Sequence, residues 1–122
     1  MTSPETLIGL RRPLNSANLD LLTLRLAELA ARGATTTYGA LAKDLGWRVA
    51  MLTEALEALM EEDAATQAPF RAALLNARLT PGQPAPGFFD KAAALGRPLS
   101  AQDIQIERAA LFAAPTKAKS AP

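Results

Sequence analysis

The sequence predicts a single, mainly α-helical domain with a small β wing, and a small all-α bundle is the alternative. Leucines recur at helical spacing through the first half of the chain, glycines follow the expected helix ends, and one later stretch favours an extended conformation. The 122 residues, 49% of them apolar, suffice for one hydrophobic core. We expect an extended arm over residues 1–17, one domain over 18–114 and a disordered tail over 115–122.

The first predicted helix runs from Asn18 to about residue 32 and stops at Gly33. Asparagine is a favourable N-cap, and glycine commonly ends helices. One face of this helix carries leucines at spacings of three and four, namely Leu19, Leu22, Leu26 and Leu29. Leu21 and Leu24 lie off this face, so a further helix or a partner is expected to cover them.

A second helix is predicted over residues 38–45, capped by Thr37 and ended by Gly46, and a third over about 47–63. The third helix has an apolar face formed by Val49, Leu52, Leu56, Leu59 and Met60. Two helices joined by a tight, glycine-containing turn are typical of a helix-turn-helix. The fold class is therefore described as winged helix-turn-helix-like.

The second half of the chain is less regular. Residues 70–79 favour a strand, which would form the wing, although their alanines also permit a helix. Residues 80–87 contain three prolines and two glycines, a composition that predicts a surface loop. Two short helices are expected to follow, over 88–95 and 100–113, and the second opens with a sequence that resembles a capping box.

The chain contains neither cysteine nor histidine. This composition removes disulfides, zinc–thiolate sites, thiol nucleophiles and the commonest general base. We therefore expect no enzymatic activity, no cofactor and no metal site. The sequence also shows no long apolar run and no signal-peptide pattern, which predicts a cytoplasmic protein that does not bind membranes.

Residues 36–46 read Thr-Thr-Tyr-Gly-Ala-Leu-Ala-Lys-Asp-Leu-Gly. This segment resembles the helix-turn-helix opening of the alkylguanine-DNA alkyltransferases and their alkyltransferase-like relatives, whose motif is Thr-Tyr-Gly, two residues, Ala, three residues and Gly. The similarity extends over residues 19–96. Leu75-Asn76-Ala77-Arg78 takes the place of the family's Pro-Cys-His-Arg strand, and Lys91 before Leu95 is similar to the family's later helix.

The resemblance implies DNA binding without alkyl transfer. In this register Asn76 replaces the alkyl-accepting cysteine, Ala77 replaces the histidine that activates it, and Arg78 matches the arginine of the motif. Asparagine cannot act as the thiolate nucleophile. The family's intercalating arginine maps to Leu52, on the expected core face, so an arginine finger that flips bases is not expected.

The predicted nucleic-acid contacts are Thr37, Tyr38, Arg71 and Arg78. The resemblance places Tyr38 against backbone phosphate near an extruded nucleotide, and Thr37 with the first helical amides could also meet a phosphate. Residues 64–99 hold four basic residues against one acidic residue. We therefore predict a non-enzymatic protein that binds DNA weakly, through its backbone; the purely structural alternative is that Thr37 only caps the helix and Tyr38 is half-buried.

The acidic third helix favours a different function. Residues 33–63 contain two basic and six acidic residues, and a surface of that sign repels phosphate. The only tryptophan, Trp47, lies beside a turn, where an amphipathic ring often marks a contact surface. The alternative is thus a protein-interaction module that uses Trp47, Leu21 and Leu24 to bind another protein or a second copy of itself. Local packing of Trp47 over the turn is the simpler explanation of that residue.

Overall fold

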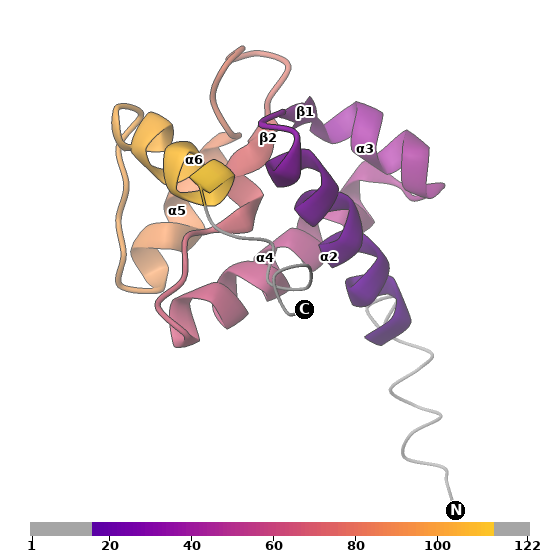
Figure 1. Cartoon of the computed structure of the whole chain (residues 1–122), viewed down its shortest axis with the longest axis horizontal. Helices are drawn as coiled ribbons and strands as arrows, with labels where there is room; N and C mark the ends of the chain where they lie inside the picture. Colours follow the sequence, from indigo (N-terminus) through magenta and orange to yellow (C-terminus); the bar gives the residue numbers. More distant parts are fainter. Residues whose placement is uncertain (1–15, 114–122) are drawn as a thin grey trace, which may run out of the picture.

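The computed structural model describes residues 16–113, so residues 1–15 of the predicted arm and all of the predicted tail over 115–122 lie outside the described part. The described residues form five α-helices, one 3-10 turn and two short strands (Figure 1). In chain order these elements are α2 (Ser16–Ala31), β1 (Thr36–Thr37), α3 (Tyr38–Leu45), α4 (Val49–Ala65), η1 (Arg71–Leu74), β2 (Leu75–Asn76), α5 (Pro86–Ala94) and α6 (Asp103–Ala113). The predicted class, mainly helical with a small β element, is confirmed.

Helix α2 begins at Ser16, so Asn18 lies within its first turn, and the predicted N-cap position at Asn18 was wrong. The helix end agrees with the sequence pattern. Gly33 adopts a left-handed φ of +63°, and the amide of Ala34 donates to the carbonyl of Leu29 at 2.9 Å. This geometry is typical of a glycine that terminates a helix.

Helices α3 and α4 form the predicted helix-turn-helix. Thr37 caps α3, since its hydroxyl oxygen accepts a hydrogen bond from the amide of Ala40 at 3.1 Å. Gly46 ends α3 with a φ of +75°, and the amide of Trp47 donates to the carbonyl of Ala42. The leucines expected to join α2 and α4 are all buried in one core: Leu22, Leu26, Leu29, Leu52, Leu56 and Leu59.

The prediction of an extended wing over residues 70–79 was wrong for most of that stretch. Phe70 immediately precedes the compact turn η1 (Arg71–Leu74), and only Leu75 and Asn76 form a strand. This strand pairs in parallel with β1, which aligns Leu75 with Thr36 and Asn76 with Thr37. The physical reason is burial: Phe70, Ala72, Ala73, Leu74 and Leu75 are all buried, and a two-sided wing strand would expose every second side chain.

The β1–β2 pairing places the start of α3 beside the loop that connects β2 to α5. This loop projects at the top of Figure 1, next to β1. Its ends are held together because the amide of Ala77 donates to the carbonyl of Gln83 at 2.7 Å. Pro86 then starts α5, a position where its missing N–H is not needed. Within residues 16–113, no helix has the length and apolar character required to cross a bilayer.

Leu52 offers a direct test of the core, since its side chain is fully buried in α4. We expect Leu52→Ala to lower the free energy of unfolding by about 2–5 kcal/mol, through lost burial and the cavity left behind. The exposed Glu54 on the same helix supplies the control, and Glu54→Ala should change stability by less than about 0.5 kcal/mol. Urea denaturation of both variants makes the comparison. Equal effects would mean that α4 packs through another face.

Candidate functional site

An apolar groove of about 560 Å³ lies between α4, the first residue of α3 and the loop after β2. Helix α4 contributes Val49, Leu56 and Met60 to its wall, and Phe88 of α5 closes one side. Two residues singled out from the sequence, Tyr38 and Arg78, also line it. The volume falls within the range of about 300–1,000 Å³ that is usual for ligand pockets.

Tyr38 forms a fixed part of the groove wall. Its hydroxyl oxygen accepts a hydrogen bond from the amide of Ala85 at 3.1 Å, which joins the start of α3 to the end of the loop. Burial raises the pKa of the Tyr38 phenol, while the Ala85 amide and the charge of Arg108 act in the opposite direction and only partly offset it. The ring is therefore held in place as a neutral phenol.

Arg78 is exposed at the groove and has no hydrogen-bond or ion-pair partner among residues 16–113. Glu57 of α4 lines the same groove. The groove lining is thus mostly apolar, with one cation, Arg78, and one carboxylate, Glu57. The groove is neither a basic channel nor an acidic surface.

Arg108 of α6 fixes the loop that forms one side of the groove. This residue is 6% exposed, and its guanidinium donates to the carbonyls of Ala73 at 2.7 Å, Leu75 at 3.3 Å and Gly82 at 3.2 Å. Burial lowers the pKa of Arg108 from its usual value, but a guanidinium remains charged in proteins. One side chain therefore connects η1, β2 and the loop.

The sequence analysis missed Arg108, although a signal was present. Ile104, Arg108 and Leu111 are spaced by four and three residues, so the arginine occupies the apolar face of the last helix. A charged residue at such a position is expected to be buried with partners.

Asn76, in the place of the family's reactive cysteine, has both ends of its amide engaged. Its oxygen accepts a hydrogen bond from Arg108 at 2.7 Å, and its nitrogen donates to the hydroxyl of Thr35 at 3.1 Å. These bonds link α6 to the residue before β1. Asn76 is not part of the groove lining.

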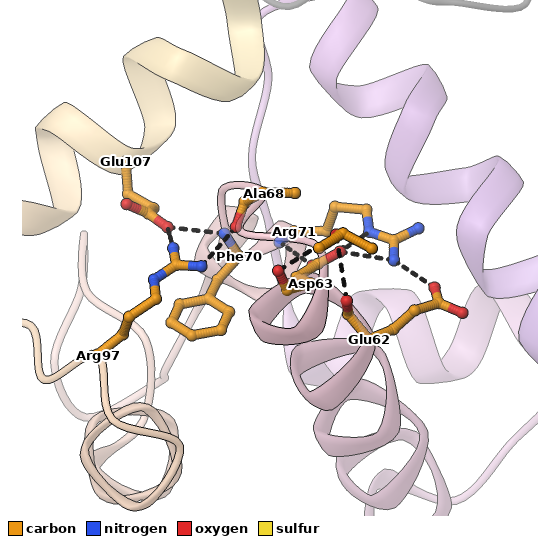
Figure 2. A network of polar contacts seen from close by, with 8 residues as sticks. Glu62, Asp63, Ala68, Phe70, Arg71, Arg97 and Glu107 are labelled. Atoms are coloured by element: carbon orange, nitrogen blue, oxygen red, sulfur yellow. Dashed lines mark hydrogen bonds and ion pairs between the residues drawn. The ribbon is translucent and has the colours of Figure 1, made fainter.

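Arg71 is held by carboxylates and does not line the groove (Figure 2). Its guanidinium contacts Asp63 at 2.7 Å and Glu62 at 2.7 Å, and its backbone amide also donates to Asp63 at 3.0 Å. Asp63 is 3% exposed, so this pair is shielded from solvent. With its donors used in this way, Arg71 does not support the phosphate contact predicted from the sequence.

The remaining basic residues of the second half are also paired. Lys91 lies 2.7 Å from Glu61, and Arg97 lies 2.9 Å from Glu107 and stacks over the ring of Phe70 (Figure 2). Ion pairs with carboxylates therefore offset the charge of three of the four cations counted in residues 64–99. Arg78 is the one that keeps its charge unpaired within the described part of the chain.

The residues of the protein-interaction alternative lie elsewhere. Trp47 is half-buried and packs against the core, which agrees with the simpler explanation of local packing. Leu21 is half-buried on α2. Leu24 is 52% exposed. None of the three lines the groove. No group of acidic side chains within residues 16–113 is arranged to hold a metal ion.

Comparison with known proteins identified no matching family model and no significantly similar curated protein or solved structure. The resemblance to the alkyltransferases consequently rests on the motif residues of the sequence. The function has to be inferred from the groove and its residues.

Asp63 provides a test of the carboxylate network. Replacing it with alanine leaves the Arg71 guanidinium short of a partner and its backbone amide unpaired, so we expect a loss of about 3–5 kcal/mol in the free energy of unfolding. Glu62 is the matched control because its side chain is 64% exposed, and Glu62→Ala should cost less than about 1 kcal/mol. Thermal melts of the two variants measure the difference. A stable Asp63→Ala variant would show that the network contributes little.

Tyr38 is the only tyrosine in the chain, so its ionisation can be followed by ultraviolet absorbance. Because burial raises its pKa, we expect the phenol to titrate above the ordinary value of about 10 in the folded protein. The unfolded chain ionises first, so the free energy of unfolding contributed by this group should fall as the pH rises above about 10. The Tyr38→Phe variant should lack that contribution. Ionisation at or below the ordinary pKa would contradict a buried ring.

Proposed function

We propose that this chain is a non-enzymatic nucleic-acid-binding protein that uses the groove beside Tyr38 and Arg78. The observation that carries the proposal is the meeting of these two residues, far apart in the sequence, on one apolar groove. Both were predicted as nucleic-acid contacts from the motif at residues 36–46 and from the segment around residue 76. None of the competing protein-interaction residues lines this groove.

The groove offers the chemistry that an unstacked nucleotide needs. Bases bind to proteins by stacking on aromatic and apolar side chains, and their phosphates bind to guanidinium groups. Here the half-buried Tyr38 ring and Val49, which is 47% exposed, supply apolar surface, while Arg78 supplies an unpaired guanidinium at the same groove. Thr37 does not line the groove but is exposed next to Tyr38: its hydroxyl oxygen accepts the capping bond, and its hydrogen can still donate to a phosphate oxygen.

We expect weak binding whose affinity falls only gradually as the salt concentration rises. The net charge of the chain is +1, and Arg71, Lys91 and Arg97 are engaged by carboxylates. Few cations are therefore left for phosphate, and each neutralised phosphate contributes about one unit to the slope of log affinity against log salt.

Arg78→Ala is the variant that tests this proposal. In anisotropy titrations of labelled DNA we expect a log–log slope of about −2 to −4 for the natural chain, and a slope shallower by about one for Arg78→Ala. The loss of affinity should be similar for all DNA sequences, because the contact is to phosphate. Lys43, an exposed cation near the opposite end of α3, provides the control, and Lys43→Ala should leave the slope unchanged.

Two outcomes would contradict the proposal. One is the absence of binding at about 50 mM salt up to a protein concentration of about 100 μM, the weak end of ordinary non-specific affinity. The other is a strong effect of Trp47→Ala with none from Arg78→Ala, which would favour the surface around Trp47, Leu21 and Leu24.

A further inference from the structure

Leu79 is a large apolar side chain that the fold leaves in solvent. It is 92% exposed, compared with 69% for Ile106, the next most exposed large hydrophobic residue within 16–113. Leu79 lines the groove from the loop after β2, and Val49, which is also exposed, lines it from α4. Apolar side chains that gather in solvent at one groove are typical of a surface that binds a partner.

The groove also carries two opposite charges that the fold leaves unpaired. Arg78 on the loop and Glu57 on α4 both line it, and neither has a hydrogen-bond or ion-pair partner among residues 16–113. Lys91, the cation of α5, binds Glu61 instead, with its ammonium group 2.7 Å from that carboxylate. The groove therefore presents one guanidinium and one carboxylate to a molecule outside the fold.

These features suit a second copy of the chain better than a small ligand. A neutral apolar molecule that covered the groove would remove water from both charges without replacing it. A small anion would pair with Arg78 but would be repelled by Glu57. A second copy offers an exposed leucine, a guanidinium and a carboxylate together. Under a two-fold axis each contact is made twice, because every residue meets its counterpart's partner on the other copy.

We propose that this groove is the interface of a two-fold dimer of the chain. Leu79 of each copy enters the groove of the other, and Arg78 of each copy pairs with Glu57 of the other. The inference goes beyond the proposed function and does not depend on it, since all of its contacts are between copies. A nucleic acid that binds the groove competes with the second copy for the same surface.

The loop that carries Leu79 is already ordered for such a contact. Its backbone is held by Arg108, which donates to the carbonyl of Gly82, and by Tyr38, whose hydroxyl oxygen accepts a hydrogen bond from the amide of Ala85. Association therefore costs little additional ordering of this segment. The net charge of +1 also leaves only weak electrostatic repulsion between two copies.

Sedimentation velocity of the full chain measures the dimer directly. Between about 1 and 500 μM, where a dimer of micromolar affinity becomes populated, we expect the natural chain to shift from monomer to dimer. Leu79→Ala should raise the dissociation constant at least about tenfold, because each dimer loses two buried leucines. Leu79→Met, which keeps the apolar length, should restore the dimer. Ile106→Ala is the control, since Ile106 is exposed on α6 outside the groove, and it should dimerise as the natural chain does.

Exchanging the two charges tests the proposed pairing. Arg78→Glu alone and Glu57→Arg alone should each weaken self-association at least about tenfold, because two attractive pairs become two repulsive ones. Mixing the two variants should restore a dimer that contains one copy of each, because opposite charges then face each other at both contacts. Asp20→Arg is the matched control for Glu57→Arg. Asp20 is an exposed carboxylate of α2 outside the groove, so this change should leave the dimer intact.

Three results would overturn the dimer. A natural chain that stays monomeric up to about 500 μM would reject it, and this is the result expected if another molecule or another segment of the same chain fills the groove. A dimer that persists unchanged in Leu79→Ala would place the contact on another face. Two charge variants that lose the dimer and do not recover it when mixed would reject the pairing of Arg78 with Glu57. No nucleic acid enters these measurements, so their failure leaves the proposed function to its own titration.

Discussion

Arg108 brings a full positive charge into the interior with no carboxylate within salt-bridge distance among the described residues. Its donors are matched by the carbonyls of Ala73, Leu75 and Gly82 and by the side-chain oxygen of Asn76. A buried cation is tolerated only when its hydrogen bonds are made, because the alternative is an unsatisfied charge away from water. Moving any of the three segments would therefore leave both the guanidinium and a carbonyl without partners. This constraint keeps the β1–β2 pair and the groove loop in one arrangement.

Charge in this protein is used mainly in ion pairs between its own residues. Residues 33–63 form an acidic block and residues 64–99 a basic one, but the structure pairs them with each other: Asp63 and Glu62 with Arg71, and Glu61 with Lys91. The acidic helix is thus less repulsive to phosphate than its composition indicates, and the basic segment is less attractive. What remains is an apolar groove with a single unpaired guanidinium from that segment.

The parts of this fold that depend on local pattern could be predicted from the sequence, and those that depend on long-range pairing could not. The leucine spacing of α2 and α4, the Thr37 cap and the stop at Gly46 follow from neighbouring residues. The structure of the stretch after Phe70 could not be predicted in this way, because consecutive buried alanines and leucines fit a strand and a compact turn equally well.

The candidate site shows the same division. Tyr38 and Arg78 could each be identified from a motif, but their meeting depends on the parallel register of β1 and β2, which no local pattern specifies. The ion pairs of Arg71 were not predicted for a related reason. The carboxylate partners of Arg71 lie on α4, and a turn separates that helix from Arg71 in the sequence. The role of Arg71 in this network is therefore visible only in the folded chain.

The contacts that build the groove also bear on the order in which the chain folds. The bond from Arg108 to Ala73 spans 35 residues and that from Asn76 to Thr35 spans 41, whereas the cap of α3 spans three. Closing a long loop costs more conformational entropy than forming a local contact. We therefore expect α3 and α4 to form early and the groove to form late. Until α6 has left the ribosome, the loop lacks the Arg108 contacts that anchor it. The groove is therefore completed only after the last helix has emerged.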